Sequence, residues 1–253
     1  MQEKINKYYE NYDEEGRLIK DNAHKPEYLT TIRYLDQLLK PNSHVLDACA
    51  GAGRYSFYLA GKGHNVTACD LLQHHINIIK TNPKATILAD VQVCNALDLF
   101  QFEENSFDAV LCMGALYHIR DAKERRKAVS ECIRVCKPDG IVALAYVTKI
   151  APIFAELNHD ASNLDELVTW LDFAEEDDVF APTNSHEIEE LALSLGLKKL
   201  HNIATDGLAY SIKDKINNAS DKNFQKYMEY HYSICENPGI INASLHGLWI
   251  GKK

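Results

Sequence analysis

The stretch HVLDACAGAGRYSFYLAGKG, residues 44–63, decides the fold. A short apolar run ends at the acidic Asp47, and a turn that contains Gly51 and Gly53 follows it. The segment after the turn has the apolar spacing of a helix and closes on two further glycines, which are typical of helix C-termini. Strand, glycine turn and helix in this order predict one βα unit.

The same alternation continues along the chain. Further strands are predicted at 65–70, 91–99, 106–114 and 141–147, and helices at 71–80 and 121–136. Five strands, most of them separated by helices, indicate an α/β fold with a parallel, doubly wound sheet.

The two ends of the chain have different patterns. An amphipathic helix is predicted at 27–39, behind a polar and aromatic arm with the composition of a lid. Near the other end, a helix at 185–196 with Ser185 as its N-cap precedes two last strands at 197–207 and 245–253, which flank a helix at 223–234. We therefore predict one domain of seven strands, with an N-terminal helical arm (1–40), a core (41–147), a cap insertion after the fifth strand (148–183) and a C-terminal part of the sheet (184–253).

Composition limits the class of function. The chain has 253 residues, 46% of them hydrophobic and 25% charged, with a formal net charge of −9. This balance is typical of a globular domain and argues against binding to nucleic acid or to an anionic membrane, which both favour a basic face. Because no export signal and no run of about 18 apolar residues is present, we expect a cytoplasmic protein.

The seven cysteines form no CxxC pair and mostly lie within apolar runs. We therefore expect all of them to be reduced core residues, and we assign no metal site. The acidic run at 175–178 is typical of a solvated surface.

The glycine turn lies where a doubly wound sheet binds its ligands, beyond the carboxyl ends of the strands. The dinucleotide pattern GxGxxG is only partly met, because Ser56 stands at the place of the third glycine. Asp47, ahead of Gly51 and Gly53, would repel a pyrophosphate but suits a ligand that carries an ammonium group. An NAD-dependent oxidoreductase, with Asp70 on the ribose, remains an alternative.

These motifs resemble the class I S-adenosylmethionine-dependent methyltransferases over about residues 40 to 200. Cys49 stands where that family commonly has its first glycine. The resemblance implies S-adenosylmethionine as cofactor, S-adenosylhomocysteine as product, and a series of binding positions. The first motif supplies Asp47, Ala48, Cys49, Gly51 and Gly53; the ribose meets Asp70 beside Leu71; the adenine meets Asn95, Ala96 and Leu97; and the methionine portion meets Met113 and Gly114.

The arm and the sequence LYHI after the fourth strand resemble a group of bacterial small-molecule methyltransferases. By that resemblance the arm folds over the cofactor, and Tyr12, Arg17 and Tyr28 meet its carboxylate or shape the pocket. The alternative is a solvated aromatic arm packed on the domain.

Methyl transfer mainly requires alignment and exclusion of water. His118 is the candidate general base, because an imidazole titrates near working pH, and Tyr117 is the candidate to orient the substrate. The alternative for His118 is a pocket wall or a helix cap. We expect the pair His74 and His75 to lie on an exposed, non-catalytic helix face.

The acceptor is predicted to be a small organic molecule. Whether oxygen, nitrogen, sulfur or carbon receives the methyl group stays open, as does the oligomeric state. A protein that binds S-adenosylmethionine without catalysis is a further alternative.

Overall fold

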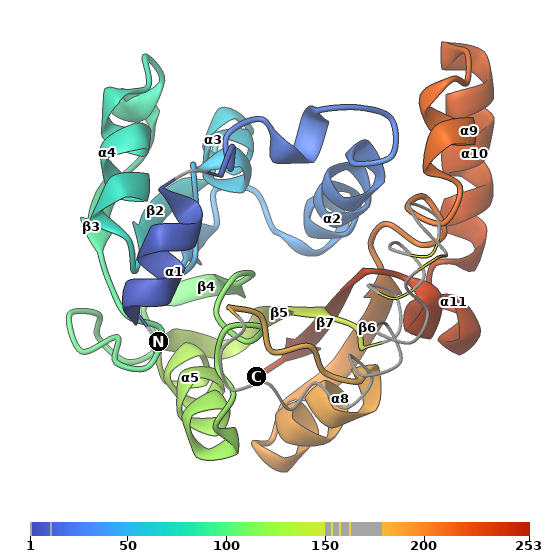
Figure 1. Ribbon diagram of the computed structural model, residues 1–253. Coiled ribbons are helices and arrows are strands. Elements are labelled where there is room, and N and C mark those ends of the chain that lie inside the picture. Colours follow the sequence, from blue (N-terminus) through green and yellow to red (C-terminus); the bar gives the residue numbers. More distant parts are fainter. Residues whose placement is uncertain (1, 11, 150–152, 154–156, 158–161, 163–178) are drawn as a thin grey trace.

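A seven-stranded sheet forms the centre of the computed structural model, which describes residues 2–10, 12–149, 153, 157, 162 and 179–253 (Figure 1). The strand order is β3-β2-β1-β4-β5-β7-β6. The first five strands are parallel, and β7 runs antiparallel to both β5 and β6. The strands are β1 (His44–Asp47), β2 (Asn65–Asp70), β3 (Asp90–Val93), β4 (Phe107–Cys112), β5 (Cys136–Val147), β6 (Lys198–Ala204) and β7 (His246–Lys252).

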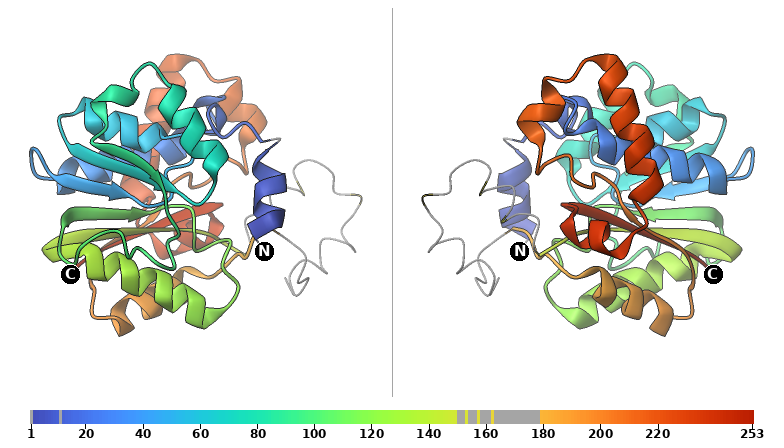
Figure 2. Two further views of the ribbon diagram at one scale, coloured as in Figure 1. Left: turned by 90° about the vertical axis from the view of Figure 1, so that its left-hand side faces the viewer. Right: turned by 90° about the vertical axis from the view of Figure 1, so that its right-hand side faces the viewer.

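Helices cover both faces of the sheet, with α2, α3 and α4 on one side and α5 and α8 on the other (Figures 1 and 2). α10 and α11 lie beside the β6 end of the sheet. The described helices are α1 (Gln2–Tyr9), α2 (Lys25–Leu38), α3 (Arg54–Gly61), α4 (Gln73–Thr81), α5 (Ala122–Val135), α8 (Ser185–Ser194), α9 (Lys213–Asn217), α10 (Asp221–Ile234) and α11 (Pro238–Ala243), with short 3-10 turns η1 (Arg17–Ile19) and η2 (Ala85–Ile87).

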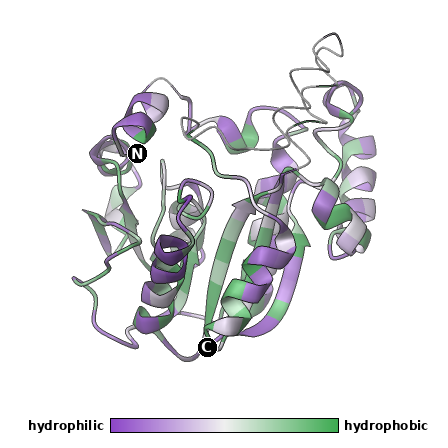
Figure 3. Cartoon of the chain, turned by 60° about the horizontal axis from the view of Figure 1, so that its bottom comes forward, coloured by the Kyte–Doolittle hydropathy of each residue, from purple (hydrophilic) through white to green (hydrophobic). Residues whose placement is uncertain are grey.

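The core lies along the central strands. Leu46, Leu111, Leu144 and Trp249 are completely buried, one each on β1, β4, β5 and β7. Because helices cover both faces, the strands contain continuous apolar runs rather than alternating residues, such as 109–112 in β4 and 141–147 in β5. The colouring of Figure 3 shows the result, with hydrophobic strands inside and hydrophilic residues on the outer faces of the helices.

The strand order reverses at β1, whose neighbours are β2 and β4. In open α/β sheets such a switch point leaves a crevice at the carboxyl ends of the strands. The turn after β1 enters this crevice with Gly51 at φ +52° and Gly53 at φ +83°, and Gly53 is the N-cap of α3. Left-handed backbone of this kind favours glycine, which explains the two residues in the turn.

Most of the predicted elements are confirmed. The strand at 65–70 and the helices in 27–39, 121–136 and 223–234 are present within a few residues of the predicted bounds. β3 is shorter than predicted and ends at Val93, because Asn95 and Asp98 form a separate two-residue bridge.

Three predictions for the second half of the chain differ from the structure or concern residues that the structure does not describe. The N-cap of α8 is Asn184 rather than Ser185. The strand predicted at 141–147 begins earlier, because β5 starts at Cys136 and includes the segment KPDG (137–140), in which Asp139 has φ +64°. The predicted cap, 148–183, falls largely outside the described residues. Among the helices that are described, none combines the length and the apolarity needed to cross a bilayer.

The prediction that all seven cysteines are reduced is wrong for two of them. Cys69 on β2 and Cys94, just after β3, form a disulfide with a Cα–Cα distance of 5.6 Å. The register explains it, because Asp70 pairs with Val93 across the parallel strands and brings the neighbouring residues together. The remaining five cysteines are free.

Candidate functional site

A cavity of about 440 Å³ opens at the carboxyl ends of β1, β2 and β4. Its volume lies in the usual range for sites that bind small molecules and cofactors. The sequence-predicted residues that line it come from all of the predicted motifs: Ala48, Cys49, Gly51, Asp70, Leu71, Asn95, Ala96, Leu97, Met113, Gly114, Tyr117 and His118. Positions chosen separately along the sequence therefore share one cavity.

Asp70 ends β2 and is held firmly at the cavity wall. Its Oδ2 accepts a hydrogen bond from the backbone N–H of Gly51 at 2.8 Å, and its Oδ1 accepts one from the N–H of Leu72 at 2.9 Å. The same Oδ1 lies 3.0 Å from Nδ1 of His75. These contacts fix the direction of the carboxylate and join the glycine turn to the end of β2.

The expectation that His74 and His75 are both exposed is wrong for His75. His75 is buried, faces Asp70 and lines the large cavity, whereas His74 is exposed. Both belong to α4, but they lie on different sides of the helix because successive residues are turned by about 100°. Sequence reasoning missed His75 because only the folded position of α4 decides which of the two meets the strand end.

Asp47 lies buried beneath the turn and is not part of the cavity lining. Its Oδ2 accepts a hydrogen bond from the Ser56 hydroxyl at 2.6 Å, while its Oδ1 has no hydrogen-bond partner among the described residues. Burial raises the pKa of Asp47 to about 7, and the nearby negative charge of Asp70 acts in the same direction. A cation placed over the turn would favour its ionised form.

Cys49 and Gly114 bring the ends of β1 and β4 into close contact. A Cβ on Gly114 would lie 2.8 Å from the Cβ of Cys49, which is too close for a side chain. Cys49, which stands where the family commonly has a glycine, is therefore accommodated because the residue that faces it after β4 is Gly114.

Asn95 and Leu97 also line the cavity. The Asn95 Oδ1 accepts a hydrogen bond from the Leu97 N–H at 2.9 Å, which turns the side chain back on its own loop. A carbonyl oxygen has two lone pairs, so one acceptor position remains for a ligand amine.

Glu14 is a site residue that the sequence analysis missed. It follows α1, lines the cavity, and lies so near the glycine turn that a Cβ on Gly51 would be 3.2 Å from its Cγ. Burial raises the pKa of Glu14, although Arg17 opposes the change. With Asp47 and Asp70 it surrounds the turn with three acids, an environment that favours a cationic ligand.

The helix α1 lines one side of the cavity through Ile5 and Tyr9. The Tyr9 hydroxyl lies 3.1 Å from Nε2 of His118, and Nδ1 of His118 lies 2.9 Å from the carbonyl oxygen of Val179. A carbonyl only accepts, so Nδ1 carries the proton and Nε2 accepts from Tyr9. The arm thus contacts the site through Tyr9.

The three predicted arm residues lie outside the large cavity. Tyr12 is partly exposed and stacks on Tyr8, and Tyr28 packs against Tyr55 and Tyr58. Arg17 lines a second, smaller cavity.

The guanidinium of Arg17 is already paired. It donates two hydrogen bonds to the carboxylate of Glu27, at 2.6 and 3.0 Å, and lies 3.6 Å from an oxygen of Glu14. These acids raise the pKa of Arg17, although burial opposes the change.

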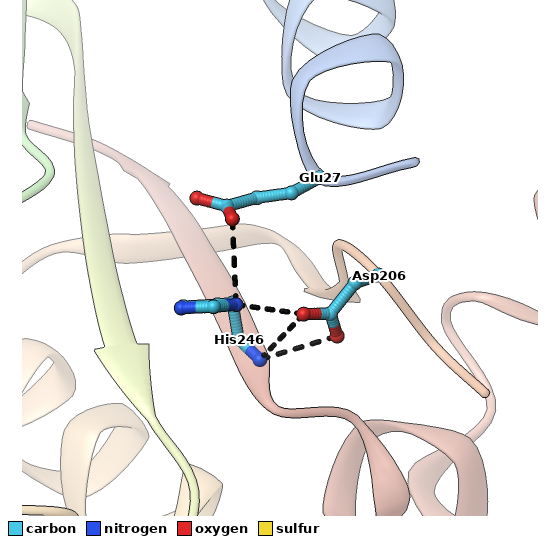
Figure 4. A group of neighbouring side chains, drawn as sticks. All are labelled: Glu27, Asp206 and His246. Carbon is cyan, nitrogen blue, oxygen red and sulfur yellow. Dashed lines mark hydrogen bonds and ion pairs between the residues drawn. The ribbon is translucent and has the colours of Figure 1, made fainter. Parts of the chain in front are cut away.

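Glu27, Asp206 and His246 form a buried cluster of side chains beside Arg17 (Figure 4). One ligand atom from each lies within 4.8 Å of the others. Both carboxylates already have partners, because Glu27 accepts from Arg17 and Asp206 accepts from Nδ1 of His246. Its donor set does not call for a metal ion.

A family model described as a methyltransferase domain matches residues 46–144. A ubiquinone biosynthesis O-methyltransferase of Xanthomonas campestris pv. campestris is 28% identical over 153 residues, which cover 53% of this chain and 63% of that protein. The S-adenosyl-L-methionine-dependent Diels-Alderase iccD of Talaromyces variabilis is 32% identical over 115 residues, covering 44% of this chain and 38% of that one. The matches thus span less than two thirds of the length of these relatives.

The fold has close counterparts among solved structures. A SAM-dependent methyltransferase from Methanosarcina mazei superposes with a TM-score of 0.57 at 18% identity, covering 87% of this chain and 96% of that chain. A likeness of this kind shows that the two chains share the fold.

Proposed function

We propose, from the premise that this chain belongs to the class I S-adenosylmethionine-dependent methyltransferases, that it transfers a methyl group from S-adenosylmethionine to a small organic acceptor and leaves S-adenosylhomocysteine. The observation that carries the proposal is the cavity of about 440 Å³, which collects residues from every predicted cofactor motif. We also propose a cytoplasmic location and no nucleic-acid partner, in line with the net charge of −9.

The residues around the cavity fit this cofactor. The fixed carboxylate of Asp70 offers two oxygens at a strand end, where vicinal ribose hydroxyls bind in related folds. Asn95 and Leu97 form a wall for the adenine. Glu14 and Asp47 supply negative charge near the glycine turn, which suits the ammonium and sulfonium groups. When bound, S-adenosylmethionine supplies a methyl group made electrophilic by its sulfonium.

The chain's own contribution is to position the reactants and to exclude water. Met113 and Tyr117 lie at the end of β4, where both cavities meet, and the Tyr117 hydroxyl donates to the Met113 carbonyl at 3.2 Å. This bond directs the Tyr117 ring along the cavity wall. Tyr9 and Ile5 cover the large cavity from the side of α1.

His118 as general base stays a prediction. It lies on the cavity wall, but its Nε2 already accepts a hydrogen bond from Tyr9. A substrate would have to displace the Tyr9 hydroxyl before this nitrogen took up a proton. The contact also suits the alternative role, in which His118 holds the arm over the site.

One comparison favours a second candidate function. The relative from Talaromyces variabilis is named as S-adenosyl-L-methionine-dependent but for a cycloaddition rather than a methyl transfer. A chain that binds the cofactor and acts without moving its methyl group is therefore the second candidate.

Calorimetry with S-adenosylmethionine, S-adenosylhomocysteine and NAD is the first test. Micromolar binding of the first two, with no heat from NAD, is the expected result. Mass spectrometry then follows the methyl group in a screen of small phenols, amines and thiols. Preference for NAD would contradict the proposed cofactor, whereas cofactor binding without any methylated product would favour the second candidate.

A further inference from the structure

The smaller cavity has a volume of about 40 Å³ and adjoins the larger one. Four residues line both cavities: Glu14, Cys49, Met113 and Tyr117. Its position at the end of β4 places it beside the predicted methionine portion of the cofactor. A space of this size takes a group of about two or three non-hydrogen atoms, because one water needs about 10–15 Å³ of such volume.

His246, the first residue of β7, lines the smaller cavity. Its Nδ1 lies 2.7 Å from Oδ2 of Asp206 and 3.4 Å from Oε2 of Glu27. In Figure 4 this nitrogen faces both carboxylates, while the other ring nitrogen points away from them. Because carboxylates only accept, Nδ1 carries the proton and the neutral ring keeps a free lone pair on Nε2.

The two acids are themselves held in place. Asp206 is completely buried and accepts hydrogen bonds from the backbone N–H groups of Leu245, at 3.0 Å, and His246, at 3.2 Å, as well as from the Ser244 hydroxyl. Glu27 is fixed by the two hydrogen bonds from Arg17. The imidazole is therefore oriented by groups that cannot rotate, as in sites where a carboxylate orients a histidine base.

We propose that His246 is a general base and that its Nε2 removes the proton from the hydroxyl group of a small, uncharged acceptor whose reacting end occupies the smaller cavity. This inference rests on the proposed function. As the acceptor O–H bond breaks, its proton passes to the Nε2 lone pair and its electron pair stays on oxygen. The oxygen then takes the methyl group, and the electrons of the broken S–C bond remain on sulfur. The imidazolium, stabilised by Asp206 and Glu27, later returns its proton to water.

Charge around the smaller cavity supports an uncharged acceptor. Arg17 is buried and already neutralised by Glu27, and Glu14 adds a further acid. Arg54, the other arginine at this cavity, is only half-buried and donates a hydrogen bond to the carbonyl oxygen of Glu15. An acceptor carboxylate would face these acids, and no fully buried cation without an acidic partner lines the cavity among the residues that the structure describes. A hydroxyl group fits both the small volume and the single proton acceptor at its wall.

The test uses the full chain, with His246→Gln as the variant and His186→Gln as the matched control. His186 is exposed on α8 and pairs with Glu190, so its replacement removes a histidine–glutamate contact far from both cavities. Catechol serves as the hydroxyl probe and aniline as its N–H counterpart. Four quantities are measured: S-adenosylhomocysteine affinity by calorimetry, methyl transfer from S-adenosylmethionine by mass spectrometry, the ring nitrogen signals of His246 by NMR, and the melting temperature.

We expect catechol to shift the Nε2 signal of His246 in the presence of S-adenosylhomocysteine and to be methylated in preference to aniline. Methyl transfer should fall at least about a hundred-fold in His246→Gln and remain unchanged in His186→Gln, as removal of a general base predicts. S-adenosylhomocysteine affinity and melting temperature should stay within a few-fold and a few degrees of the wild type.

The failures are distinguishable. A wild-type chain that binds S-adenosylhomocysteine but neither binds nor methylates catechol overturns this inference alone. So does a His246→Gln variant with wild-type turnover, or one that loses affinity for S-adenosylhomocysteine, since the smaller cavity would then belong to the cofactor. A wild-type chain that binds neither cofactor form overturns the proposed function, and this inference with it.

Discussion

The carboxylate of Asp70 and the backbone N–H of Gly51 are joined by a hydrogen bond of 2.8 Å. This contact joins the end of β2 to the turn after β1. It holds the two parts of the proposed cofactor site at a fixed separation before any ligand arrives. A preorganised carboxylate of this kind loses little conformational freedom on binding.

Replacing Asp70 by alanine should weaken S-adenosylhomocysteine binding by about ten- to a hundred-fold. The change removes the proposed charged acceptor for the ribose, worth roughly 1.5–3 kcal/mol for hydrogen bonds to a charged group, and also releases the Gly51 turn. Calorimetry measures the affinity directly. Asp90→Ala, an exposed acid on the neighbouring strand β3, is the control and should bind as the wild type does. Equal affinities in the two variants would remove Asp70 from the site.

Residues whose roles depend on their place in a βα unit could be predicted from the sequence. Asp70 and Asn95 stand at or just beyond strand ends, and parallel strands bring such positions to one edge of the sheet. Glu14 and His246 could not be predicted in this way. Glu14 reaches the site because the arm folds back over the glycine turn, and His246 because β7 inserts between β5 and β6. Both placements depend on contacts between distant segments, which leave no periodic signal.

Asp47→Asn should change the pH dependence of stability in the ligand-free chain. The pKa of Asp47 is raised to about 7 in the folded state, so between its ordinary value of 3.8 and 7 the folded state binds more protons than the unfolded state. The contribution of this group to stability is therefore complete below the unfolded pKa and is lost as the pH rises through the folded pKa.

Urea unfolding at about pH 5 and pH 8 measures the effect. The advantage of Asp47→Asn over the wild type should be larger at the higher pH by roughly 3 kcal/mol, since about two pH units separate pH 5 from the folded pKa and each corresponds to about 1.4 kcal/mol. The exposed Asp98→Asn variant should show no such difference. A pH-independent gap between Asp47→Asn and the wild type would mean that Asp47 does not titrate in this range.

The Cys69–Cys94 disulfide should stabilise the chain and the adjoining wall of the large cavity. It lies directly beside Asp70 and Asn95, and it closes a sequence separation of 25 residues. In the chain-entropy model a loop of this length contributes about 3 kcal/mol. Reduction should therefore lower the melting temperature, and Cys94→Ser should abolish the response to reductant. Cys235→Ser, at a buried free cysteine, should leave the response intact. Mass spectrometry after alkylation without reductant would contradict the assignment if Cys69 and Cys94 were both labelled.

The pH profile of turnover should identify which histidine removes the proton. Burial opposes the charged form of His246, but Glu27 and Asp206 more than offset it and raise the pKa of His246 above its ordinary value of 6.5. A base acts only when it is unprotonated, so wild-type turnover should be lost as the pH falls through this raised pKa and be complete above it.

The variants His246→Gln and His118→Ala then give opposite results. If His246 is the base, His246→Gln turns over slowly and no longer shows the loss of turnover at low pH. His118→Ala still shows that loss at low pH and changes mainly the apparent affinity for the substrate, because it frees Tyr9 and the arm. If His118 is the base, the loss of turnover at low pH disappears in His118→Ala instead. The measurement separates the two because Nε2 of His118 is bonded to Tyr9 in the large cavity, whereas His246 is held by two carboxylates at the wall of the smaller one.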